Sequence, residues 1–226
     1  MQHIAPISID VVSDVVCPWC YIGLKRLDAA MAQASEIPVD LRWRPYQLDA
    51  TIPPEGRDRK QYMLAKFGSE ERLNEIFARV SEAGRSAGID FALDAIQVSP
   101  NTLDAHRLIR WAGSAENNLQ TEVKKRLMQA YFEDGRNIGD RAVLVDIARE
   151  AGMDAAVVEA LLPTEADVAE TRAEIETAQQ MGVTGVPCYL LEGRYAVMGA
   201  QDPAVLANAI RQVSAAKARG ELGPAA

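Results

Sequence analysis

The segment Cys17-Pro18-Trp19-Cys20 constrains this chain most, because it joins a strand pattern to a helix pattern. A β-branched apolar stretch, residues 7–13, precedes it, and an apolar-periodic stretch follows it to about Ala34. In the first turn of a helix, residues three apart lie on one face, so the two sulfur atoms can meet. Backbone N–H groups and the helix dipole favour the nucleophilic thiolate at Cys17. The spacing therefore predicts a dithiol–disulfide pair, with Cys17 as nucleophile and Cys20 resolving its mixed disulfide.

Composition excludes several classes of site. Three Cys and two His are too few for a disulfide scaffold, and the Cys pair lacks the second pair that a zinc site needs. We therefore predict no metal; a half-site shared across a dimer is the one zinc arrangement left open, and it is disfavoured. The net charge of -8 argues against a nucleic-acid partner. Neither a Walker motif nor a Gly-x-Gly-x-x-Gly after a strand is present, so we predict no nucleotide cofactor.

The expected compartment follows from what the chain lacks. No stretch approaches the ~20 apolar residues of a membrane span, and residues 1–6 lack the charged and apolar regions of a signal peptide. An odd number of cysteines fits a reducing compartment better than an oxidising one. We expect a cytoplasmic monomer or homodimer with no membrane partner.

Strand patterns occur near both ends of the chain and helix patterns fill its middle. Residues 38–46 alternate as a second strand, which completes a βαβ unit with parallel strands. Residues 187–191 and 195–198 read as a hairpin, and Asp202-Pro203 as the start of a final helix. Between them, helices are predicted over 59–67, 70–87, 102–113, 122–133, 141–151, 155–162 and 165–181.

This order, β-α-β, a helical block, then β-β-α, is the layout of an α/β thioredoxin fold with a large all-helical insertion. We expect a discontinuous thioredoxin-like domain from residues 1–50 and 182–220. Residues 51–181 then form an inserted helical domain that covers the cysteine pair as a lid.

The chain resembles the DsbA-like branch of the thioredoxin superfamily, and within it the FrnE-type oxidoreductases. Residues 14–23, Asp-Val-Val-Cys-Pro-Trp-Cys-Tyr-Ile-Gly, and residues 182–187, Gly-Val-Thr-Gly-Val-Pro, carry the resemblance. Residues 100–106 and 199–203 support it, and the matches span nearly the whole chain in the expected order.

The resemblance implies further site residues. It implies that the Val186-Pro187 bond is cis and faces the cysteine pair, and that the backbone there pairs with an extended substrate or with glutathione. It places Asn101 and His106 near the cleft, and Gln201 and Asp202 where relatives receive the γ-glutamyl end of glutathione. From the residues alone, His106 is equally well a hydrogen-bonded helix residue and Asp202 a simple helix cap.

Pro18 and Trp19, between the cysteines, influence the reduction potential of the pair. Trp19 is either a substrate contact or a packing residue.

The resemblance has two departures. Cys188 stands where relatives usually carry an aromatic or aliphatic residue; because its side chain points away from that of Pro187, core packing is favoured over a redox role. The related 2-hydroxychromene-2-carboxylate isomerases and kappa-class glutathione transferases carry Ser where Cys17 stands, which puts their chemistry in doubt here.

The sequence leaves three functions open. The first is a thiol–disulfide oxidoreductase acting on protein or small-molecule disulfides, with no tightly bound cofactor and with glutathione as a reductant or ligand. The second is a glutathione-dependent isomerase or transferase. The third is a peptide-binding chaperone without catalysis.

Overall fold

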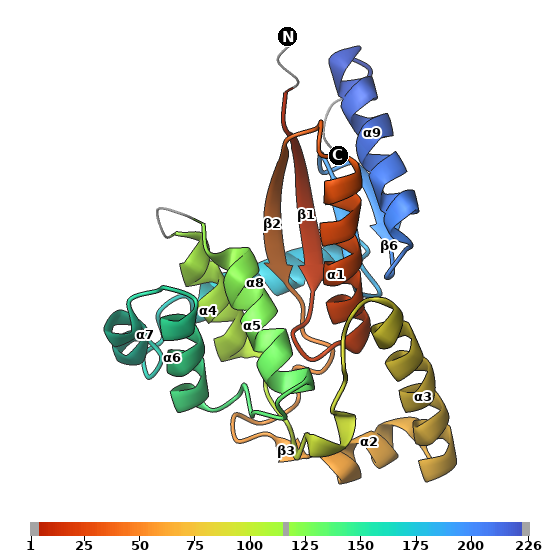
Figure 1. Ribbon diagram of the computed structural model, residues 1–226. Coiled ribbons are helices and arrows are strands. Elements are labelled where there is room, and N and C mark those ends of the chain that lie inside the picture. The colour runs from red at the N-terminus through yellow and green to blue at the C-terminus, as the bar shows by residue number, and fades with distance from the viewer. Residues whose placement is uncertain (1–4, 115–117, 223–226) are drawn as a thin grey trace.

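The computed structural model describes residues 5–114 and 118–222, which form an α/β thioredoxin fold (Figure 1). The strands are β1 (Ile7–Ser13), β2 (Val39–Pro45), β3 (Arg57–Asp58), β4 (Val98–Ser99), β5 (Cys188–Leu191) and β6 (Tyr195–Met198). The helices are α1 (Pro18–Gln33), α2 (Arg59–Phe67), α3 (Glu70–Ser86), α4 (Leu103–Gly113), α5 (Gln120–Phe132), α6 (Arg141–Glu150), α7 (Ala155–Leu161), α8 (Val168–Gln180) and α9 (Pro203–Ala218), with a 3-10 turn at Leu93–Ala95. None of the helices in these ranges is long and apolar enough to cross a membrane.

The main sheet joins the two ends of the chain. Its strand order is β2-β1-β5-β6, with β1 and β2 parallel and the other pairs antiparallel. The predicted βαβ unit and C-terminal hairpin are therefore confirmed, and the strands after the helical block do complete the sheet begun before it. The division into two domains stays a prediction.

Successive side chains of each strand point to opposite faces, and this alternation sorts the core. On one face, Ile9, Val11 and Tyr189 pack in the main core beneath α1 and α9, which lie side by side (Figure 1). On the other face, Val12 and Cys188 pack against Ala178 of α8. Each face of the sheet therefore has its own apolar layer.

The helices from α2 to α7 gather around one end and one edge of the sheet, whereas α8 covers one of its faces. Figure 1 shows α2 and α3 beyond the N-terminal end of α1, and α4 to α7 on the side of β2. Tyr21 of α1 stacks on Phe132 of α5, and its hydroxyl donates a hydrogen bond to the Glu133 carboxylate. This contact joins the first helix after the cysteine pair to the helical block.

Two details differ from the sequence-based expectation. The insertion was expected to be all-helical, but Val98 and Ser99 pair with Asp58 and Arg57 in a separate two-stranded ribbon. The last long helix of the block was expected from residue 165, whereas α8 begins at Val168 after Asp167, which adopts the left-handed conformation with φ of 57°.

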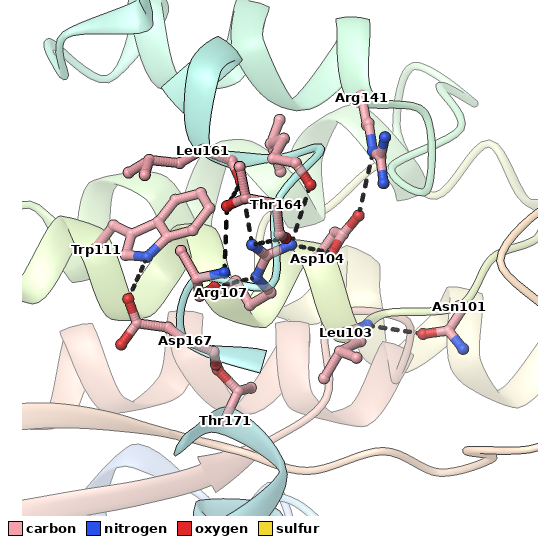
Figure 2. A network of polar contacts seen from close by, with 12 residues as sticks. Asn101, Leu103, Asp104, Arg107, Trp111, Arg141, Leu161, Thr164, Asp167 and Thr171 are labelled. Carbon is pink, nitrogen blue, oxygen red and sulfur yellow. Dashed lines mark hydrogen bonds and ion pairs between the residues drawn. The ribbon is translucent and has the colours of Figure 1, made fainter. Parts of the chain in front are cut away.

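The cause of the later start is a buried cation, Arg107 of α4 (Figure 2). Its guanidinium donates hydrogen bonds to the Asp104 carboxylate and to the carbonyl oxygens of Leu161, Leu162, Thr164 and Ala166, at 2.7–3.2 Å. Those carbonyl groups converge on one point, which a continuous helix cannot provide because its carbonyls all point along the axis. The need to satisfy a buried charge therefore outweighs local helix propensity in this segment.

Candidate functional site

Cys17 is the N-cap residue of α1, and Pro18 occupies the first helical turn. The Cys17 backbone is extended, with φ of -92° and ψ of 114°, so its side chain lies at the helix N-terminus rather than along its flank. Its sulfur lies 3.8 Å from the carbonyl oxygen of Val186, and the Val186-Pro187 peptide bond is cis. The fold therefore brings together two segments 169 positions apart, which is the arrangement that the family resemblance implied.

The two thiols of this pair have opposite electrostatic environments. The Cys20 thiol donates a hydrogen bond to the Cys17 sulfur, and this lowers the pKa of Cys17 below its ordinary value against the opposing effect of burial; the N–H groups of Cys20 and Trp19 act in the same direction. Burial, together with the hydrogen bond and charge of Cys17, raises the pKa of Cys20 well above its ordinary value. Cys17 is thus the more acidic thiol of the pair, and Cys20 is the one that holds its proton more firmly.

Three buried ionisable side chains lie beneath the pair: Asp14, His106 and Lys124. The carboxylate of Asp14 accepts hydrogen bonds from the His106 ring at 3.2 Å and from the backbone N–H of Leu48 at 2.8 Å. Burial alone would raise the pKa of Asp14, but these bonds and the nearby positive charge hold it below its ordinary value. Asp14 is therefore a carboxylate, and its own backbone carbonyl accepts the N–H of Cys17 at 3.3 Å.

The tautomer of His106 follows from its partners. Its Nε2 atom lies 3.2 Å from the Asp14 carboxylate and 2.9 Å from the Tyr46 carbonyl oxygen, and both are acceptors. Nε2 must therefore carry the proton. Burial lowers the pKa of His106 below its ordinary value, so the ring is neutral and Nδ1 carries a lone pair.

Lys124 supplies the positive charge of this cluster. Only 1% of the residue is exposed, and its ammonium donates a long hydrogen bond of 3.5 Å to the Ser13 carbonyl oxygen. Burial lowers the pKa of Lys124 to about 8, although the charges of Cys20, Asp14 and Cys17 oppose the shift. The ammonium in turn favours negative charge on Cys20.

Close packing fixes the distance between α1 and the strand that carries Pro187. A Cβ atom on Gly23 would lie 2.4 Å from the Tyr189 hydroxyl and 2.8 Å from a ring carbon of Pro187. Pro187 and Tyr189 are two positions apart, so both face α1. Glycine at position 23 thus allows the helix and the Pro187 segment to approach.

Apolar side chains are exposed around the pair. Trp19 is 40% exposed, so the packing interpretation of this residue is incomplete and its ring is available to a substrate. Leu48, whose N–H contacts Asp14, is also exposed.

The remaining residues expected at the site have local partners. Asn101 donates to the Ile52 carbonyl oxygen and accepts from the N–H of Leu103, so it holds a loop to the start of α4. Asp202 accepts the N–H of Ala204 as an ordinary N-cap. Gln201 is exposed and donates to the Met198 carbonyl oxygen. His106 is buried against Asp14, and the cavity that it lines is not lined by the cysteine pair.

Cys188 lies away from the pair, on the opposite face of the sheet. Its side chain packs with Val12, Ala178 and Val183, and burial raises the pKa of its thiol. This position fits the core-packing interpretation. Across residues 5–114 and 118–222, no three His, Cys, Asp or Glu side chains are grouped to hold a metal ion.

Comparison with known proteins agrees with this geometry. Residues 8–211 match the family model of the DSBA-like thioredoxin domain. The chain belongs to the DsbA-like thioredoxin family.

Relatives of this DsbA-like protein cover nearly its whole length. The Bacillus subtilis protein YwbO is 26% identical over 209 residues, or 90% of this chain and 96% of YwbO. A probable DsbA oxidoreductase from Streptomyces coelicolor is 29% identical, with a TM-score of 0.84 over 97% of this chain and 93% of that one. The cytosolic disulfide reductase DsbM from Pseudomonas aeruginosa, solved with GSH, shares the fold at 18% identity, with a TM-score of 0.62 over 94% and 98% of the two chains.

Sequence reasoning missed Lys124 in this DsbA-like protein. A signal was present, because Lys124 shares a helix face with Leu127, Met128 and Tyr131, all of them buried. A lysine within an apolar stripe either extends its charge to water or needs a buried function. The sequence alone does not show that this stripe faces the cysteine pair.

Proposed function

We propose that this DsbA-like protein is a thiol–disulfide oxidoreductase that reduces protein or small-molecule disulfides, with Cys17 as nucleophile and Cys20 as resolving residue. The observation that carries the proposal is the Cys17 sulfur at the N-terminus of α1, 3.8 Å from the carbonyl oxygen that precedes cis-Pro187, with the pKa of Cys17 lowered and that of Cys20 raised. Such a pair is suited to attack a disulfide first through one sulfur and then through the other.

The reaction balances within the site. The Cys17 thiolate attacks a sulfur of the substrate disulfide, the substrate S–S bond breaks, and a Cys17–substrate disulfide forms as one substrate thiolate leaves. Cys20 then loses its proton and attacks Cys17, which releases the second substrate thiolate and leaves a Cys17–Cys20 disulfide. Two protons and two electrons pass from the dithiol to the substrate disulfide, which becomes two thiols.

The order of the two attacks follows from the charges. While Cys17 is a thiolate, its hydrogen bond and charge keep the proton on Cys20. Once Cys17 is bound in the mixed disulfide, that charge is gone and the pKa of Cys20 falls. Lys124 then favours the Cys20 thiolate, and the Asp14–His106 pair lies in the same buried cluster. Cys20 therefore becomes a reactive thiolate only after the substrate is attached to Cys17.

A low-molecular-weight thiol is needed to return the protein to the dithiol, and we propose glutathione in a cytoplasmic setting. The shared fold with DsbM, a cytosolic disulfide reductase solved with GSH, supports testing this reductant. We propose that glutathione acts at Cys17 as a reactant and that no cofactor is held tightly.

The test is trapping of the mixed disulfide. Purified Cys20→Ser protein is treated with dithiobis-nitrobenzoate, the symmetrical disulfide of thionitrobenzoate. The mass of the protein and the amount of thionitrobenzoate released are then measured. We expect one adduct on Cys17, stable for hours, while the wild type releases a second equivalent and forms an internal disulfide. Cys17→Ser is expected to form no stable adduct at Cys20. Equal turnover of disulfides by Cys17→Ser and wild type would contradict the proposal.

The same variants separate the other functions. A glutathione-dependent isomerase retains turnover of its substrate in Cys20→Ser, and a chaperone retains suppression of aggregation in Cys17→Ser. The oxidoreductase loses insulin reduction by glutathione in both variants.

A further inference from the structure

A cavity of about 270 Å³ lies between β2 and helices α4, α5 and α8. At ~30 Å³ per water molecule, it has the volume of about nine waters. Its wall includes Trp43, His106, Gln120 and Lys124, whereas neither the Cys17–Cys20 segment nor Val186-Pro187 lines it. The cavity therefore reaches two members of the buried cluster, His106 and Lys124, without being lined by the cysteine segment.

The charges in the wall are mainly positive. Three arginines and Lys124 line the cavity, with Glu174 as the one carboxylate among the lining residues in the described part of the chain. The arginines already have acidic partners: Arg42 pairs with Asp40, Arg44 with Asp10 and Glu174, and Arg110 with Asp167 and Glu174. Lys124 differs, since no carboxylate of the described residues forms an ion pair with it.

The ammonium of Lys124 has more donors than partners. It carries three N–H groups, and its contacts are the 3.5 Å hydrogen bond to Ser13 and the ring of Trp43, whose centroid is 5.6 Å away. A buried charge with so little compensation is costly unless a further acceptor is supplied. One helical turn earlier, Gln120 uses its carbonyl oxygen to accept the N–H of Trp43, and its amide nitrogen lies towards Gly113 on the cavity wall.

Positively charged side chains lie at both the buried end and the solvent end of the cavity. Lys124 is at the buried end, while the side chain of Arg42 is 48% exposed and therefore lies at the solvent end. A ligand with two carboxylates can meet both, one at each end. The amide of Gln120 offers a further donor between them.

We propose that this cavity is a binding site for a small dicarboxylate, which pairs with Lys124 and lowers the reactivity of the cysteine pair. The coupling rests on the proposed function, because Lys124 is the cation that favours negative charge at Cys20. The titratable and charged groups around Lys124 are Cys17, Cys20 and Asp14, together with neutral His106, the three arginines and Glu174 of the cavity wall. A ligand carboxylate neutralises Lys124, so ligand binding and thiolate formation oppose each other, each by the same factor.

Binding is tested with succinate by calorimetry on the reduced, full-length protein, at pH 7 and constant ionic strength set with chloride. We expect saturable one-site binding that weakens at least tenfold in Lys124→Met and several-fold in Arg42→Gln. Lys125→Met is the matched control, because Lys125 is the next residue on α5 and pairs with Asp28 on the surface. Absence of binding to the wild type, or equal binding to all four proteins, would overturn the site.

The coupling is tested by titrating the thiolate absorbance of the wild type with and without saturating succinate. We expect succinate to lower the thiolate fraction at a given pH by about fivefold or more, with no effect in Lys124→Met. An unchanged titration with succinate bound would refute the coupling. Failure of the proposed function is distinguishable, because an inactive protein would still bind succinate with the same dependence on Arg42 and Lys124.

Discussion

Asp14 and His106 stand 92 positions apart and join by a hydrogen bond of 3.2 Å beneath the cysteine pair. Asp14 lies three positions before Cys17, whereas His106 comes from the helical block. The bond therefore links these two segments of the chain close to the cysteine pair. It also leaves a buried carboxylate dependent on a partner from another element.

Removing that partner should destabilise the protein most near neutral pH, where Asp14 is ionised. The lowered pKa of Asp14 contributes stability that is present above its unfolded pKa and is lost as pH falls through the folded value. His106→Ala raises the folded pKa of Asp14, so acid unfolding should begin at a higher pH, and neutral stability should fall by about 3–5 kcal/mol. Urea unfolding across pH 3–7 measures both effects. His106→Gln retains a donor and should recover part of the loss; equal acid midpoints for all three proteins would contradict this role.

Lys124→Met should slow the second step of disulfide reduction more than the first. Losing the ammonium raises the pKa of Cys20, so the mixed disulfide should persist longer in stopped-flow or quenched assays. Stability should be unchanged or higher, because replacing a buried charge by an apolar side chain of similar size removes its desolvation cost. Lys125→Met should behave as wild type. Normal resolution in Lys124→Met would remove Lys124 from the mechanism.

The pKa of Cys17 should depend on the hydrogen-bonding capacity of residue 20. The Cys20 thiol is the largest influence lowering it, so Cys20→Ala should raise the pKa of Cys17, whereas Cys20→Ser keeps a donor and should raise it less. Because the folded pKa in the wild type is below that of a free cysteine, alkylation of Cys17 should reach its plateau at lower pH than alkylation of a peptide thiol. Iodoacetamide rates against pH, with mass spectrometry to assign the site, measure this order. Identical profiles for Ala and Ser would contradict it.

Gly23→Ala should disrupt the approach of Pro187 to α1. The new methyl group would lie 2.4 Å from the Tyr189 hydroxyl and 2.8 Å from the Pro187 ring, so the helix and strand must separate. We expect a loss of about 1–3 kcal/mol in unfolding free energy and slower disulfide reduction. Gly185→Ala is a nearby control with open space around the added carbon, and it should be neutral or stabilise by up to about 1 kcal/mol. Equal behaviour of the two variants would refute the packing argument.

Arg107→Met should release the segment between α7 and α8. The change leaves the Asp104 carboxylate and four carbonyl groups without their common donor, so stability should fall by about 3–5 kcal/mol. Amide exchange should accelerate in residues 161–171 more than in the main sheet. Arg149→Met, which removes an exposed ion pair with Asp146, should cost less than about 1 kcal/mol. Uniform acceleration of exchange across both regions would show a global effect instead.

Local pattern along the chain determined much of this protein. Alternation and apolar periodicity predicted the four strands of the main sheet and the last helix, because those segments bury one face against a single core. The spacing of Cys17 and Cys20 at a strand-to-helix junction predicted the reactive pair, and the family resemblance predicted Pro187 opposite it. These features depend on residues that are close in sequence or on complete sequence motifs.

Only the tertiary structure decided which charges lie under the pair. Lys124 and His106 sit on different helices, and their shared position beneath Cys20 depends on how those helices pack against β2. The late start of α8 also depends on tertiary contacts, because the buried Arg107 donates hydrogen bonds to carbonyl groups of a segment that is distant in sequence. Burial sets the cost of an unpaired charge, and burial belongs to the assembled fold and not to any stretch of sequence. For this reason the sequence predicted the two sulfur atoms and Cys17 as the nucleophile, whereas the fold determined which buried charges surround them.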